Sequence, residues 1–150
     1  MATVSKAVIG VTLFLAGCAP ALKAPTLQVQ GLKKGQVGIT GAKLDVVFGV
    51  RNPNPDDIAV EKMEFELLLN GNGVGRGYVP EPFSIRGFAE EKVVSTVDVN
   101  YLRVPGAIKA VLEDDEVRAR ARGVFYVRRG GGLKKLDFDS DATVSLGREY

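Results

Sequence analysis

The residues that could carry out chemistry are few, and the commonest catalytic groups are missing. The chain of 150 residues contains one cysteine, Cys18, and no histidine. Without histidine there is no Ser-His or Cys-His couple for nucleophilic catalysis and no usual zinc-ligand set. Catalysis by lysine or carboxylates alone stays open, but no constellation of such residues points to it. We therefore expect a protein that is not an enzyme and that uses no metal and no cofactor.

Cys18 follows a segment that is typical of export. Lys6 is the only charge in the first seventeen residues, and Ala7 to Leu15 form a nearly unbroken apolar run. A positive start, a short apolar core and small residues near a cleavage point make a secretory signal peptide. The run is shorter than the roughly 20 apolar residues that a membrane-spanning helix needs. We expect residues 1–17 to be removed.

The four residues Leu15-Ala16-Gly17-Cys18 resemble the lipobox of bacterial lipoproteins. The resemblance implies cleavage between Gly17 and Cys18 and acyl chains on Cys18, and two or more chains hold a protein stably in a membrane. Ala19 stands where an Asp would imply retention at the inner membrane, so in a diderm host we expect the outer membrane, facing the periplasm. Two other interpretations remain open: ordinary cleavage after Ala19, or a buried cysteine in a cytosolic protein.

The remaining chain has the size of one domain on a short tether. Residues 18–25 contain two prolines and fit a tether, which leaves 26–147 for one folded domain. The full chain has 20 Lys and Arg against 18 Asp and Glu, which argues against nucleic acid as a partner. We expect a monomeric domain in the cell envelope whose partners are the membrane, through Cys18, and client proteins or lipid surfaces.

Apolar and polar residues alternate along most of the chain, which predicts strands with one buried face. The clearest strand carries Leu44, Val46, Phe48 and Val50 on its buried face. Further strands are expected at 60–70, 91–100, 117–127 and 136–146, with weaker ones at 26–32 and 77–85. Helical spacing predicts one short crossover helix over about 105–113. This pattern predicts a mainly all-β fold, an antiparallel β-sandwich of about seven strands.

The order of these elements resembles the late embryogenesis abundant (LEA) type 2 family and its water-stress and hypersensitive-response (WHy) domain. The motif Asn52-Pro53-Asn54 ends a strand, and Gly77 and the PEPFSI segment follow at the expected places. The resemblance spans about 26–146 and implies an immunoglobulin- or fibronectin-III-like sandwich. It also implies protection against desiccation or related stress, often by exported lipoproteins in bacteria. The alternative is an envelope module that binds a protein or lipid through its edges and loops.

The motif Asn52-Pro53-Asn54 has a structural interpretation of its own. Proline cannot donate to a strand ladder, and asparagine side chains imitate backbone groups in turns. We expect the motif to terminate a strand and to have no ligand.

Two strands near the C-terminus carry opposite charges at the same two-residue period. The residues are Arg118, Arg120 and Arg122 on one strand and Asp137, Asp139 and Asp141 on the other. A hairpin through RRGGG would pair 122 with 137, 120 with 139 and 118 with 141, a salt ladder on an exposed face. A bulge at Gly123 would spoil this register and would favour a phosphate or lipid headgroup site.

Overall fold

The computed structural model describes residues 21–104 and 113–148. The expected cleavage site at Gly17 and Cys18 lies outside these residues, as does nearly all of the expected helix over 105–113. The described strands are β1 (Thr26–Val37), β2 (Gly41–Arg51), β3 (Ile58–Leu69), β4 (Asn72–Val79), β5 (Phe83–Ile85), β6 (Glu90–Asn100), β7 (Glu116–Arg129) and β8 (Gly132–Arg148). The prediction of an all-β protein is confirmed.

The eight strands form one continuous sheet in the order β4-β3-β7-β8-β1-β2-β6, with β5 paired to β3. Most neighbours are antiparallel, but β1 and β8 run parallel where Leu32 faces Leu146. This short parallel contact joins β4-β3-β7-β8 to β1-β2-β6. An immunoglobulin- or fibronectin-III-like sandwich has two separate sheets, whereas these strands form one sheet. The predicted sandwich is therefore not confirmed.

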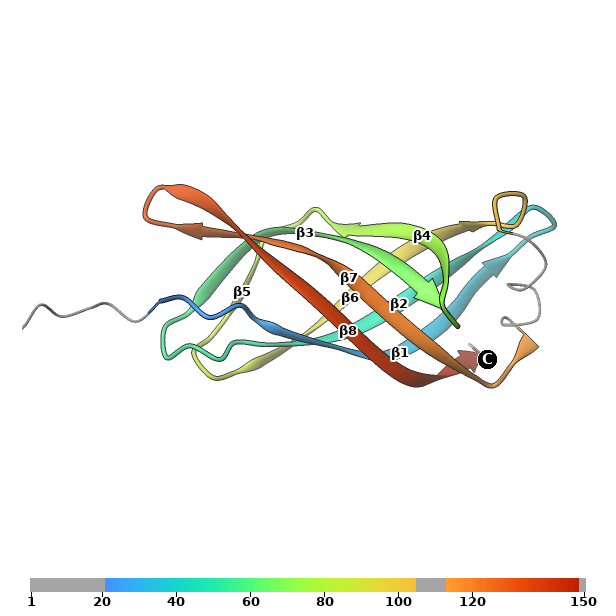
Figure 1. The fold of residues 1–150 in the computed structure, drawn as a ribbon, viewed down its shortest axis with the longest axis horizontal. Helices are drawn as coiled ribbons and strands as arrows, with labels where there is room; N and C mark the ends of the chain where they lie inside the picture. The colour runs from blue at the N-terminus through green and yellow to red at the C-terminus, as the bar shows by residue number, and fades with distance from the viewer. Residues whose placement is uncertain (1–20, 105–112, 149–150) are drawn as a thin grey trace, which may run out of the picture.

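The sheet curls until its two edge strands, β4 and β6, face each other in a nearly closed, barrel-like arrangement (Figure 1). The Ser95 hydroxyl on β6 donates a hydrogen bond to the Tyr78 carbonyl oxygen on β4 at 3.0 Å. Gly75 permits the close approach, because a Cβ there would lie 2.9 Å from the carbonyl oxygen of Asp98. Each edge therefore covers the other over part of its length.

The core lies inside the curled sheet and follows from the alternation in the sequence. Leu44, Val46, Phe48 and Val50 are all fully buried, as the pattern predicts. The ring of Phe48 meets that of Phe65 edge to face, with centroids 4.9 Å apart. Among the described residues the fully packed core runs from Val29 to Leu146. A chain that starts at Cys18 therefore keeps every described strand and core residue.

Candidate functional site

The motif Asn52-Pro53-Asn54 joins β2 to β3, and its first residue is completely buried. The side-chain amide of Asn52 donates to the carbonyl oxygen of Asp56 at 2.8 Å and to that of Ile85 at 3.0 Å. Its backbone N–H donates to the carbonyl oxygen of Ala89 at 2.9 Å. Asn52 therefore ties the β2–β3 loop to both sides of the β5–β6 loop.

Asn54 links Asn52 to the segment before β1, through which the chain enters the domain. Its backbone N–H and its Nδ2 both donate to Oδ1 of Asn52, at 2.9 and 3.0 Å. The Asn54 side chain then pairs with the backbone of Lys23 in both directions, at 2.9 Å each way. The motif ends a strand, as predicted, and it also holds the tether in place, which the sequence did not indicate.

Phe88, in the β5–β6 loop, has an unusual backbone. It adopts a positive φ of 57° and leaves 61% of its surface exposed. Its N–H donates to the carbonyl oxygen of Asn54 at 3.0 Å, so the asparagine that holds Lys23 also holds Phe88. A positive φ is rare for a bulky residue and costs free energy.

The positive φ falls on Phe88 because the preceding glycine has another role. A Cβ at Gly87 would lie 2.6 Å from the carbonyl carbon of Pro55. The Gly87 N–H donates to Oδ1 of Asp57 at 3.0 Å. Gly87 therefore lets the β5–β6 loop touch the β2–β3 loop, and Phe88 makes the turn back into β6.

These loops lie at the end of the molecule where the chain enters, here called the proximal end (Figure 1, left). The β7–β8 hairpin reaches the same end, with the entering chain between the hairpin and the two loops. The hollow between them has a volume of about 390 Å³, and its lining includes Leu22, Lys23, Phe88, Arg128 and Arg129. Sequence reasoning missed this site, although the Arg-Gly-Phe step at 86–88 places an aromatic residue in a loop.

The predicted salt ladder exists in part, with a different register. Arg118 binds Asp141 through two nitrogens, with an Nη2–Oδ2 distance of 2.6 Å, and Arg120 binds Asp139 at 2.5 Å. These pairs run diagonally, because the residue directly opposite Arg120 is Asp141. The predicted register is wrong by two residues, since Gly130 and Gly131 take the two positive-φ positions of the hairpin turn.

The third predicted pair, Arg122 with Asp137, does not form. The Arg122 guanidinium binds Glu66 on β3, with an Nη2–Oε2 distance of 2.8 Å. Asp137 lies opposite Val124 instead. No bulge occurs at Gly123, so the condition that favoured a phosphate or headgroup site on this face is not met.

The ladder also shifts the acidity of its members. The hydrogen bond from Arg118 lowers the pKa of Asp141, and the hydrogen bond from Arg120 lowers that of Asp139. The same contacts raise the pKa values of the two arginines. All four side chains are exposed, so water screens the pairs and each stabilises the fold only slightly.

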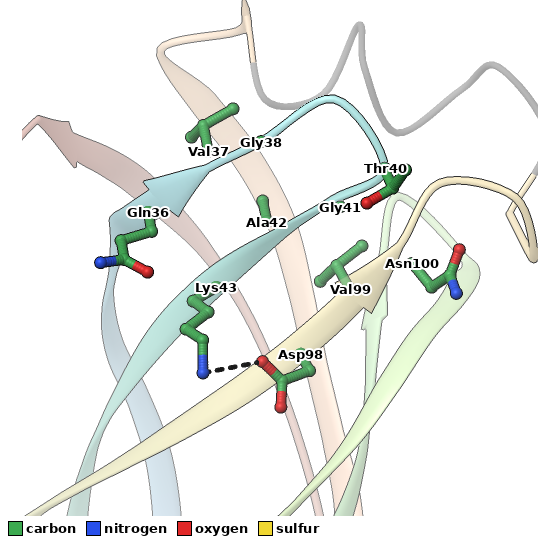
Figure 2. Close-up of a pocket in the computed structure, with 10 residues that line it drawn as sticks. All are labelled: Gln36, Val37, Gly38, Thr40, Gly41, Ala42, Lys43, Asp98, Val99 and Asn100. Carbon is green, nitrogen blue, oxygen red and sulfur yellow. Dashed lines mark ion pairs between the residues drawn. The ribbon is translucent and has the colours of Figure 1, made fainter.

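A second hollow lies at the opposite, distal end, with a volume of about 680 Å³ (Figure 2). Ala42 and Val99 line it, and Lys43 and Asp98 point toward each other beside it with a 3.4 Å Nζ–Oδ1 distance. The pair links the neighbouring strands β2 and β6, in which Lys43 lies directly opposite Asp98.

Three exposed apolar side chains lie at this distal end. They are Val37, 61% exposed, Ile39, 99% exposed, and Leu102, 85% exposed. The Tyr101 N–H donates to the Thr40 carbonyl oxygen at 3.0 Å, which brings the β1–β2 turn beside the residues that follow β6. We call these three residues the distal tip.

Within 21–104 and 113–148, no group of three or more His, Cys, Asp or Glu side chains could hold a metal ion. In the same part of the chain, no helix has the length and apolar character required to cross a membrane.

The chain is similar to proteins of known structure. The described fold is similar to a solution structure from Arabidopsis thaliana, with 18% identity, 91% of each chain covered and a TM-score of 0.66. It is also similar to the solution structure of a late embryogenesis abundant (LEA) protein, at 18% identity. That match covers 89% of this chain and 77% of the other, with a TM-score of 0.50. No curated protein sequence matches the chain significantly.

The family model described as "Late embryogenesis abundant protein" (LEA_2) matches residues 47–142. The chain is therefore a member of the LEA type 2 family, as the sequence pattern predicted.

Proposed function

We propose that this chain is a lipid-anchored protein of the bacterial cell envelope that protects its surroundings during desiccation or related stress without catalysing a reaction. The observation that carries the proposal is family membership over 47–142. The protected partners would be client proteins or the lipid surface itself, shielded from contact as water is removed.

The folded surface suits a shielding role. Charged side chains of β3, β7 and β8 bind one another, as in Arg120–Asp139, Arg122–Glu66 and Arg128–Glu61. No buried side-chain polar atom among the described residues lacks a hydrogen-bond partner. Such a domain needs no bulk water to satisfy its buried polar side chains, which supports a mechanism in which it stays folded as neighbouring proteins dry.

The anchor in this proposal is Cys18, exposed by cleavage after Gly17 and carrying acyl chains. In a diderm host the site would be the outer membrane, facing the periplasm. The experiment expresses the full chain and a Cys18→Ala variant in a diderm bacterium fed with labelled palmitate. Label and membrane fractionation are expected for the full chain and not for Cys18→Ala. A matched control, Ala21→Cys added to Cys18→Ala, should not restore the label.

The same strains test protection. Cells that carry the full chain are expected to survive drying better than cells without it, and Cys18→Ala should lose at least part of that advantage. Labelling of Cys18 with no effect on survival would retain the anchor and refute the protective role.

A second candidate function is an envelope binding module, and the distal tip favours it. Val37, Ile39 and Leu102 form an exposed apolar surface at the end away from the tether. The strand edges are weaker candidates, because β4 and β6 face each other. Substituting Ile39→Ser and Leu102→Ser should abolish partner capture if this function is right, with Val94→Ser on β6, 54% exposed, as the control.

A further inference from the structure

We propose that the proximal end of the domain docks on the surface of the anchoring membrane. Phe88 and Leu133 would enter the boundary between headgroups and acyl chains, and basic side chains around them would contact anionic headgroups. The inference rests on the lipid anchor of the proposed function, because the anchor supplies the nearness that docking needs.

The chain between the anchor and the domain is short. Asn54 fixes the backbone of Lys23 through two hydrogen bonds. Cys18 lies five residues before Lys23 in the sequence. Five residues reach at most about 18 Å when fully extended. An anchored domain therefore holds its proximal end within that distance of the membrane, and the distal tip at the far end of its long axis (Figure 1).

Phe88 combines a strained backbone with an exposed ring. A positive φ at a phenylalanine stores strain, and here it presents a side chain that is 61% exposed. The ring is not among the side chains that form or pack against the described core. Aromatic side chains favour the membrane–water interface, where the ring leaves bulk water. Leu133, 56% exposed and next to the β7–β8 turn, adds a second apolar group at the same end.

The proximal end also carries exposed basic side chains. Lys23, Arg86, Arg129 and Lys134 are exposed on the entering chain, the β5–β6 loop and the β7–β8 hairpin. None of the ion pairs formed among residues 21–104 and 113–148 includes any of them. Arg128 is left out of this set because it binds Glu61.

Carboxylates also lie at this end: Asp56, Asp57 and, at the start of β6 shortly after Phe88, the exposed Glu90 and Glu91. Asp56 and Asp57 line the proximal hollow, and Asp57 accepts the hydrogen bond from Gly87. Basic side chains near a membrane surface are attracted to anionic headgroups, so the four cations outside these ion pairs favour an anionic lipid surface.

The test uses two features of the sequence: one cysteine and no tryptophan. A chain that starts at Cys18 is coupled through its thiol to a maleimide lipid, which supplies an anchor whether or not cells add one. Phe88→Trp then places a unique fluorophore at the proximal end, and Leu102→Trp places one at the distal tip. Vesicles are either phosphatidylcholine alone or equimolar phosphatidylcholine and phosphatidylglycerol.

Docking predicts that the emission of Phe88→Trp shifts to the blue on the anionic vesicles and is quenched by brominated lipid. Leu102→Trp should show neither effect. Adding Arg86→Glu and Arg129→Glu to Phe88→Trp should abolish the difference between anionic and neutral vesicles. Arg103→Glu, the same charge change beside the distal tip, should leave that difference intact.

The inference is overturned if the emission of Phe88→Trp is unchanged on both vesicles, or if Leu102→Trp shifts instead. Palmitate labelling of Cys18 in cells is a separate measurement. A labelled Cys18 with no shift at Phe88→Trp retains the anchor and refutes docking. An unlabelled Cys18 refutes the anchor of the proposed function, and docking in the cell with it.

Discussion

Asn54 and Lys23 form two hydrogen bonds like those between neighbouring strands, Asn54 through its side chain and Lys23 through its backbone. The Lys23 N–H donates to Oδ1 of Asn54, and Nδ2 of Asn54 donates to the Lys23 carbonyl oxygen, both at 2.9 Å. Asn54 is nearly buried and is itself held by Oδ1 of the fully buried Asn52. The Asn52-Pro53-Asn54 motif therefore positions the entering chain.

Replacing either asparagine by alanine should destabilise the domain, with the larger effect at Asn52. Asn52→Ala leaves several buried backbone groups without a partner, so we expect a loss of about 2–3 kcal/mol in the free energy of unfolding. For Asn54→Ala we expect about 1–2 kcal/mol. Urea unfolding measures both. Asn72→Ala, at an exposed asparagine at the start of β4 with a 3.5 Å contact, should change the value by less than about 0.5 kcal/mol.

The positive φ of Phe88 predicts a substitution that stabilises the protein. Glycine adopts this conformation without steric cost, so Phe88→Gly should raise the free energy of unfolding by about 1 kcal/mol. Phe88→Ala keeps the strained backbone and should bring no such gain. If both variants are equally stable, the strain assigned to this residue is absent. Under the docking proposal, Phe88→Gly should also weaken contact with anionic vesicles.

Gly123 is needed where β7 pairs with β3. A Cβ at this position would lie 2.7 Å from Cα of Phe65, and backbone atoms cannot move aside as a side chain can. Gly123→Ala should therefore cost about 1–3 kcal/mol in the free energy of unfolding. Gly31→Ala is the matched control, because nothing lies within 4 Å of a Cβ there. Equal stabilities for the two variants would contradict the close packing of β3 and β7.

The arginine–aspartate pairs should make stability depend on pH in acid. Arg120 and Arg118 lower the folded-state pKa values of Asp139 and Asp141 below those of the unfolded chain. Their contribution is therefore complete above the unfolded value, about pH 4, and is lost as pH falls through the folded values. The Tm of the natural chain should fall more steeply below about pH 4 than that of a variant with Asp139→Asn and Asp141→Asn.

Asp137→Asn on the same strand is the control for this comparison. Asp137 forms no ion pair among the described residues. Its substitution should leave the acid dependence of Tm unchanged. If Asp137→Asn weakens the acid dependence of Tm as much as Asp139→Asn and Asp141→Asn together do, then general charge, and not the ion pairs, causes that dependence.

Local patterns predicted the strands well, because the side chains of a strand alternate between its two faces whatever its neighbours are. The inward set of β2, from Leu44 to Val50, follows directly from that period. The register of β7 and β8 did not follow, because three consecutive glycines offer several two-residue turns. The chain uses Gly130 and Gly131, and that choice shifts every cross-strand pair by two.

The contacts that build the proximal end join segments far apart in the sequence, and no local pattern predicts them. Asn54 meets Lys23 across 31 positions, and Asn52 meets Ile85 across 33. The pairing of Arg122 with Glu66 likewise needs the knowledge that β3 and β7 are neighbours. The positive φ at Phe88 also depends on such a contact, because Gly87 packs closely against the backbone of Pro55.

Under the proposed function, the folded domain itself protects other molecules as water is removed. The most direct measurement dries a sensitive enzyme with the chain that starts at Cys18, its thiol capped, and assays the activity that returns on rehydration. Equal masses of an unrelated β-sandwich and of albumin are the controls. We predict recovery clearly above both controls. Recovery no better than theirs would contradict the protective function and would favour a binding module that acts through the distal tip.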